Sequence, residues 1–124
     1  MSLRYFNHSE FDSPDLPDSG KNMDNTFLDM LDNARAIAGI SFDINSGYRT
    51  EQHNAKVGGK PKTAASKGSS HMYGYAADIA VQNGAERWIV VKSLIDAGFK
   101  RIGIAKTFIH TDNDPDKPNA IWSY

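Results

Sequence analysis

The stretch that decides the fold reads SSHMYGYAAD and runs from Ser69 to Asp78, near the middle of a chain of 124 residues. Its polar first part ends at Gly74, a residue type that lets the backbone turn sharply. The two alanines that follow are small enough to pack closely against a neighbouring element. This pattern predicts a loop followed by a strand, with His71 before the turn and Asp78 directed inward from the strand.

Helices and strands are expected on both sides of this stretch, from the spacing of apolar residues and the position of turn residues. The expected elements are helices over residues 25–38, 50–57 and 85–97, and strands over residues 42–45, 76–81, 101–104 and 107–112. Only residues 105–106 separate the last two strands, which predicts a tight hairpin. In the third helix, Trp88, Val91, Leu94 and Ile95 are predicted to share the buried face.

The remaining segments are rich in turn residues. Residues 60–70 are expected to form an exposed loop, and the Asp- and Pro-rich residues 113–119 are expected to wrap the surface before an aromatic end at residues 121–124. Helices intermixed with antiparallel strands predict an α+β fold, with a small antiparallel sheet and flanking helices. The length predicts a single domain over residues 1–124.

Composition excludes several classes of function. The formal net charge is -1 with mixed signs, so we expect no nucleic-acid partner. The chain has no cysteine, which excludes disulfides, thiolate zinc sites and a catalytic Cys. No apolar run is long enough for a membrane helix and no signal peptide is recognised, so we expect no membrane insertion. A monomer is the default for such a chain.

A second histidine, His110, follows about thirty residues after the first motif, in Phe108–Asp112 (FIHTD). Together with His71 and Asp78 it provides two imidazoles and one carboxylate, the ligand set of a hydrolytic zinc site that keeps an open fourth position. The other two histidines, His8 and His53, have no such partners in the sequence, and we interpret them as packed or surface residues.

Two further residues are candidates for catalysis. Asp112 lies two residues after His110, and residues i and i+2 of a strand face the same side. It could be the base that takes a proton from zinc-bound water, or a partner that orients a ligand such as His110, and both alternatives stay open. Arg49, by itself a typical salt-bridge residue, is the best cation for a substrate carboxylate or for the charge on a tetrahedral intermediate.

The alternating acids Asp112, Asp114 and Asp116 are typical of a solvated loop. Alternate acids also occur in Ca²⁺ loops, but the later bidentate Glu and the spacing of an EF-hand are missing here. We therefore reject a calcium site.

The motifs combine into a longer pattern. The string Ser69-x-His71-x-x-Gly74-x-Ala76-x-Asp78 is preceded by Ser46–Thr50 (SGYRT) and His53–Gly59, and it is followed by Phe108–Asp112. This pattern resembles the zinc D-alanyl-D-alanine carboxypeptidase family, and most closely its small single-domain branch among phage endolysins and bacterial murein peptidases. The resemblance covers nearly the whole chain, since Phe6–Phe11 is similar to the opening of that branch and Trp122-x-Tyr124 to its close.

The resemblance implies a fold shared with the hedgehog signalling domain and a Zn²⁺ ion bound by His71, Asp78 and His110. It implies hydrolysis of peptide bonds in the stem or cross-bridge of peptidoglycan, as a D,D-carboxypeptidase or an endopeptidase. Zinc-bound water would attack the carbonyl, with a carboxylate serving as base and then as acid to the leaving amine. Arg49 would lie near the substrate or the oxyanion, and the protein would act on the cell wall, in the periplasm or delivered by a phage.

One departure from the family pattern concerns the base. Well-known members carry the catalytic carboxylate three residues before the last histidine ligand, and here that position holds Thr107. Either Asp112 takes the role, or an acid from elsewhere does, or the protein binds zinc without efficient turnover. The leading hypothesis is a zinc-dependent murein peptidase. The alternative is a non-catalytic, zinc-stabilised module that binds peptidoglycan or a protein partner.

Overall fold

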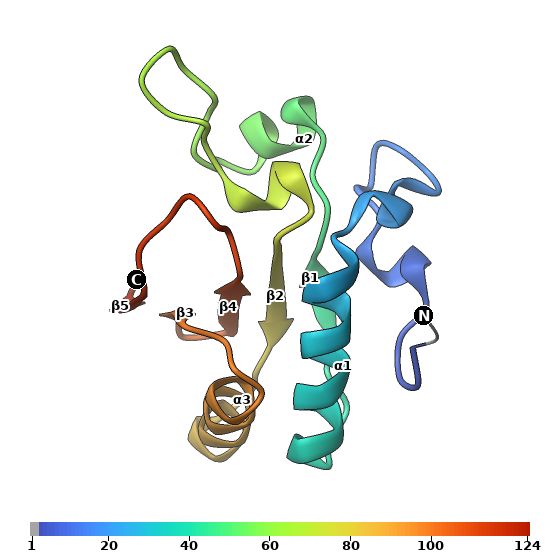
Figure 1. Ribbon diagram of the computed structural model, residues 1–124, viewed down its shortest axis with the longest axis vertical. Helices are drawn as coiled ribbons and strands as arrows, with labels where there is room; N and C mark the ends of the chain where they lie inside the picture. The colour runs from blue at the N-terminus through green and yellow to red at the C-terminus, as the bar shows by residue number, and fades with distance from the viewer. Residues whose placement is uncertain (1–2) are drawn as a thin grey trace.

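The computed structural model describes residues 3–124, which form a twisted sheet with helices packed on it (Figure 1). Within these residues the elements are α1 (Asn25–Ala38), β1 (Ile44–Ser46), α2 (Glu51–Lys56), β2 (Ala76–Ala80), α3 (Gly84–Asp96), β3 (Arg101–Ile104), β4 (Phe108–Asp112) and β5 (Ala120–Ser123). Short 3-10 helices cover His8–Phe11, Ser19–Asn22 and Ser70–Tyr73. The prediction of an α+β fold is confirmed.

The sheet has five strands in the order β1-β2-β4-β3-β5. The pairs β1/β2, β2/β4 and β4/β3 are antiparallel, as expected from the sequence, and the hairpin between β3 and β4 closes where Ala105 N donates to Phe108 O at 3.0 Å. β5, which the sequence analysis did not predict, pairs in parallel with β3. The sheet is therefore mixed, because residues 113–119 carry the chain from the end of β4 past the start of β3.

The two faces of β2 and β4 have opposite chemistry. Ile79 and Ile109 pair across the strands and are fully buried in the core. Their neighbours Asp78 and His110 also pair, and the alternation of side chains along a strand places them on the opposite face. Successive residues of β2 and β4 therefore face the apolar core and the polar site in turn.

The core side of the sheet is covered by α1 and α3, which pack against each other (Figure 1). Asp24 caps the start of α1, where its side chain accepts from Phe27 N, and Gly39 caps the end of the helix in the left-handed conformation with φ 69°. Both boundaries agree with the sequence. The fully buried side chains of the core include Phe27, Leu28, Leu31, Ile79, Leu94, Ile102 and Ile109.

The predicted buried face of α3 is partly wrong. Leu94 is fully buried and Val91 packs against the core, but Trp88 is 63% exposed and Ile95 is 48% exposed. The helix turns Val90 and Ser93 inward instead. The sequence pattern could not separate these faces, because apolar residues occur on nearly all sides of this helix. Within residues 3–124, none of the helices combines the length and apolar character of a membrane span.

Candidate metal centre

A row of side chains across the sheet forms the floor of the site. Asp78 on β2 lies opposite His110 on β4, His110 lies opposite Gly103 on β3, and Gly103 lies opposite Trp122 on β5. Gly103 leaves the space into which the tryptophan leans, since a Cβ there would lie 2.7 Å from Trp122 Nε1. The indole ring therefore reaches His110, with 5.6 Å between ring centroids.

His71 approaches this row from above, on the 3-10 helix Ser70–Tyr73. The Ser69 side chain caps the helix by accepting from His71 N at 3.3 Å, and Gly74 ends it with φ 77°. A Cβ on Gly74 would lie 2.3 Å from Asn22 O, so the predicted sharp turn requires glycine for space as well as for conformation. The 3-10 helix contacts β2, and this contact brings His71 to Asp78.

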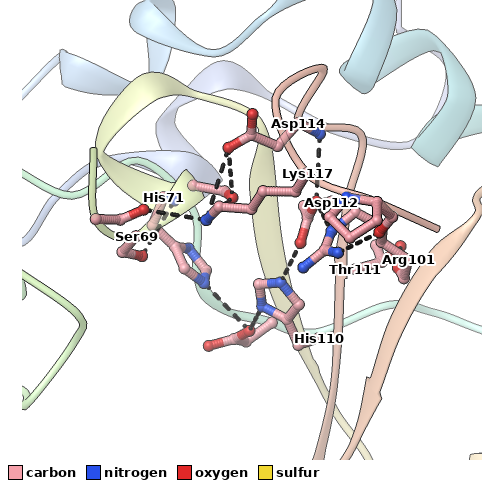
Figure 2. A network of polar contacts seen from close by, with 12 residues as sticks. Ser69, His71, Arg101, His110, Thr111, Asp112, Asp114 and Lys117 are labelled. Atoms are coloured by element: carbon pink, nitrogen blue, oxygen red, sulfur yellow. Dashed lines mark hydrogen bonds and ion pairs between the residues drawn. The ribbon is translucent and has the colours of Figure 1, made fainter. Parts of the chain in front are cut away.

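His71, Asp78 and His110 converge, and we refer to them as the metal cluster. One potential ligand atom from each lies within 4.8 Å of the others, and all three residues are buried. His71 Nε2 is 3.3 Å from Asp78 Oδ1, and His110 Nδ1 is 2.9 Å from the same oxygen. Figure 2 shows both imidazole rings turned toward this one point.

The outer nitrogen of each imidazole is held by an acceptor. His71 Nδ1 is 2.8 Å from Gly47 O, and because a carbonyl can only accept, Nδ1 carries the proton and Nε2 the lone pair. His110 Nε2 is 2.7 Å from Asp112 Oδ2. Such bonds fix the orientation of metal-binding histidines. His71 Nε2 is buried without any hydrogen-bond partner, which fits a lone pair reserved for a ligand.

The charges of the metal cluster depend on one another. Burial lowers the pKa of His71, so its imidazole is neutral. Burial by itself would raise the pKa of Asp78, but the hydrogen bond from His110 Nδ1 outweighs it and holds that pKa well below its usual value. Burial also opposes the charged form of His110, yet its bonds to Asp112 and Asp78 raise its pKa. Metal binding here would therefore displace a proton from His110 Nδ1.

Arg49 contacts the metal cluster at the carboxylate of Asp78. Its Nη2 donates to Asp78 Oδ2 at 3.3 Å, while Nε donates to Ser46 Oγ at 2.9 Å and Nη1 to Asn54 Oδ1 at 3.2 Å. Asp78 Oδ1 is thus left for the histidines. Each terminal nitrogen of Arg49 carries a second N–H, and the side chain lines the cleft described below. Its role toward a substrate stays a prediction.

Asp112 has contacts at both of its oxygens. Oδ2 accepts from His110 Nε2, whereas Oδ1 accepts from Arg101 Nε at 2.7 Å and from Asp114 N at 3.2 Å. The side chain is only 1% exposed. This is the geometry of a residue that orients His110, the second of the two alternatives that the sequence left open. A role for Asp112 as a base stays a prediction.

A second buried polar cluster lies beside the first, and we call it the Asp114 cluster (Figure 2). Ser70 Oγ donates to Asp114 Oδ2 at 2.7 Å, Lys67 Nζ donates to Asp114 Oδ1 at 2.8 Å, and Lys117 Nζ donates to Ser70 Oγ at 2.8 Å. The prediction that Asp112 and Asp114 belong to a solvated loop was therefore wrong, because lysine and serine side chains pack over Asp114.

The metal cluster lines a cleft of about 410 Å³. In the described part of the chain its cationic side chains are Arg49, Lys60, Arg101 and Lys117, and its carboxylates are Asp78 and Asp112. The aromatic side chains Phe108, Trp122 and Tyr124 line it as well. These side chains give the lining of the cleft an excess of positive charge.

The other two histidines lie outside the metal cluster, as the sequence predicted, and one residue of the site was not predicted. His8 is exposed and His53 half-buried, and neither belongs to the metal cluster. Thr107, one residue before β4, is exposed. Arg101 was not among the predicted site residues, although the predicted hairpin contained the signal. The register that pairs Gly103 with His110 brings Arg101 opposite Asp112 two residues away.

The comparisons with known proteins agree with this geometry. A family model described as Peptidase M15 matches residues 7–112, a span that includes the whole metal cluster and Asp112. The search of curated proteins returned no match.

Proposed function

This chain belongs to the peptidase M15 family, the family of metallopeptidases that the motifs predicted, and we propose that it is a zinc-dependent peptidase acting on bacterial peptidoglycan. The bond it hydrolyses would lie in the stem or cross-bridge peptide, by D,D-carboxypeptidase or endopeptidase action. The observation that carries this proposal is the buried lone pair of His71 Nε2, aimed at the carboxylate that His110 also contacts.

The donor set fits zinc. Two imidazole nitrogens and one carboxylate oxygen are borderline and hard ligands that suit Zn²⁺, and three protein ligands leave one position for water or substrate. A zinc ion held by His71, Asp78 and His110 would supply a Lewis acid that polarises a carbonyl and makes a bound water acidic near neutral pH.

The surrounding residues would bind and orient the substrate. Arg49 can donate its second terminal N–H groups to a carboxylate or to the developing oxyanion, while it holds Asp78 in place. Lys60 extends the positive lining of the cleft, and the aromatic side chains Phe108, Trp122 and Tyr124 would limit the access of water to it. A peptide with a free carboxylate, such as a stem ending in D-alanine, complements this lining.

The test is digestion of purified peptidoglycan, with free D-alanine and new amino termini measured over time. We expect products from the zinc-loaded protein, loss of products with a chelator, and recovery on addition of zinc. His71→Ala should release nothing, whereas the matched control His8→Ala, at an exposed histidine outside the metal cluster, should keep full activity. Bound zinc at one ion per chain without any product would refute the peptidase.

A second candidate function has one observation in its favour. Among the described residues that line the cleft, the carboxylates are Asp78 and Asp112, and both are engaged by histidine and arginine side chains. A non-catalytic zinc-stabilised module that binds peptidoglycan or a protein partner would need no further acid. Co-sedimentation of the zinc-loaded protein with peptidoglycan in the absence of products, to the same extent in wild type and in Asp112→Ala, would favour this module.

A further inference from the structure

Arg101 is a cation of the cleft that three different groups hold in place. It lies at the first position of β3, and its side chain is 15% exposed. Nε donates to Asp112 Oδ1 at 2.7 Å, Nη1 donates to Pro118 O, and the guanidinium carbon lies 4.9 Å from the centre of the Trp122 ring. A carboxylate, a carbonyl and an aromatic face therefore restrain one planar group from three directions.

This restraint extends to the metal cluster through Asp112. The bond from Arg101 fixes Oδ1, and Asp114 N donates to the same oxygen at 3.2 Å. With Oδ1 fixed, the carboxylate plane directs Oδ2 at His110 Nε2, 2.7 Å away. The opposite ring nitrogen, Nδ1, then faces Asp78.

We propose that Arg101 is a positioning residue of the metal centre, which aligns Asp112 and through it sets the direction of His110 Nδ1. The carboxyl-terminal segment contributes to this alignment, because Pro118 and Trp122 hold the guanidinium of Arg101 in place. The inference rests on the metal site of the proposed function and is independent of peptide hydrolysis.

Lysine cannot replace Arg101 in this arrangement. An ammonium group can pair with Asp112, but it cannot at the same time present a planar fork to Asp112 and Pro118 and stack on the ring of Trp122. Gly103 maintains the stacking from the neighbouring position, since any side chain there would displace the indole.

The first experiment measures zinc affinity of the full chain by competition with a chromophoric chelator. Arg101→Met should weaken zinc binding by about 10- to 100-fold, the usual effect of losing a group that supports a metal-binding histidine. Arg101→Lys keeps the charge and should show a smaller loss. The matched control is Arg87→Met, because Arg87 is half-buried and donates to the carbonyls of Ala105 and Lys106 without contacting a carboxylate. Its zinc affinity should stay within about twofold of wild type.

A double-mutant cycle separates positioning from general damage to the fold. If Arg101 acts through Asp112, Arg101→Met combined with Asp112→Asn should bind zinc no more weakly than Asp112→Asn alone. In proton NMR spectra of the zinc-loaded protein, the downfield resonance of the His110 Nε2 proton should shift in Arg101→Lys and stay unchanged in Arg87→Met.

Unchanged zinc affinity in Arg101→Met would overturn the inference. Additive losses in the cycle, or equal losses in the Arg101 and Arg87 variants, would do the same. If Arg101→Met fails to fold, Arg101→Lys decides by the same two measurements. Failure of the proposed function has a different outcome, because peptidoglycan would then stay intact while the Arg101 effects on zinc affinity persist.

Discussion

The metal cluster and the Asp114 cluster are both buried and polar, yet they differ in how completely the protein satisfies them. Among the described residues, the Asp114 cluster leaves no buried side-chain atom without a hydrogen-bond partner, because lysine and serine donors match its carboxylate. The metal cluster leaves His71 Nε2 without one. Burial of a polar group costs free energy unless it finds a partner, so the incomplete cluster indicates a missing ligand and the complete one indicates a structural role.

The largest effect is expected from His71→Ala. Removal of this ligand should weaken zinc binding by more than about 100-fold, beyond the usual loss from outer residues, and should end peptide release. Isothermal titration with zinc measures the loss, with His53→Ala as a matched control at a half-buried histidine outside the metal cluster. If His71→Ala bound zinc with the wild-type affinity, the metal cluster would not be the zinc site, and its unpaired nitrogen would not indicate a missing ligand.

Asp114→Ala should lower the stability of the fold and leave zinc binding in place. Loss of this carboxylate leaves Lys67 without its buried partner, and we expect the free energy of unfolding to fall by about 3 kcal/mol in urea titrations of the zinc-free protein. One zinc ion per chain should still bind. Asp116→Ala is the matched control, since Asp116 also contacts Lys67 at 2.8 Å but is 68% exposed, and an exposed pair contributes only about 0–1 kcal/mol. Equal losses in both variants would contradict a buried structural role.

The pH dependence of stability should identify the same carboxylate. Burial would raise the pKa of Asp114, but hydrogen bonds from Lys67 and Ser70 outweigh it and lower the pKa below the ordinary 3.8. The folded state therefore binds fewer protons than the unfolded state, and the stability from Asp114 is complete above pH 3.8 and is lost as the pH falls through the folded-state pKa. Urea titrations at a series of pH values below 3.8 measure this loss. As the pH falls, the free energy of unfolding should decrease less steeply in Asp114→Asn than in wild type.

The smallest effect is expected from Ser70→Ala, at the residue that joins the two clusters. Ser70 Oγ bonds to Asp114 and Lys117, while its neighbour in the chain is His71. We expect a loss of about 1.5 kcal/mol in the free energy of unfolding, the lower end of the range for hydrogen bonds to charged groups, and a change in zinc affinity of less than about threefold. A large drop in zinc affinity without a change in stability would show that the clusters are coupled.

The sequence predicted what depends on local pattern. Helix α1 has a capping aspartate, an apolar face and a final glycine, and the strand with Asp78 follows from a turn that only Gly74 permits. The ligand set could be proposed because the motif around His71 and the shorter one around His110 are each local. The assignment of those residues to zinc stays a prediction.

What the sequence could not give depends on tertiary contacts. Asp114 looks like any loop acid until Lys67 and Ser70 fold over it from more than forty residues away. Trp88 looks like a core residue, and its exposure is decided by how α3 lies against α1. β5 is too short and too irregular in pattern to be recognised before β3 is there to pair with it.

The hydrogen bond between His71 Nδ1 and Gly47 O has a consequence for local dynamics. Gly47 packs closely on Phe11, and the next amide, Tyr48 N, donates to Phe11 O at 2.8 Å. The amino-terminal segment and the metal centre therefore share one piece of backbone. A ligand that immobilises His71 would make opening of this piece costlier, and amide hydrogen exchange at Tyr48 would slow even though that amide lies outside the metal cluster.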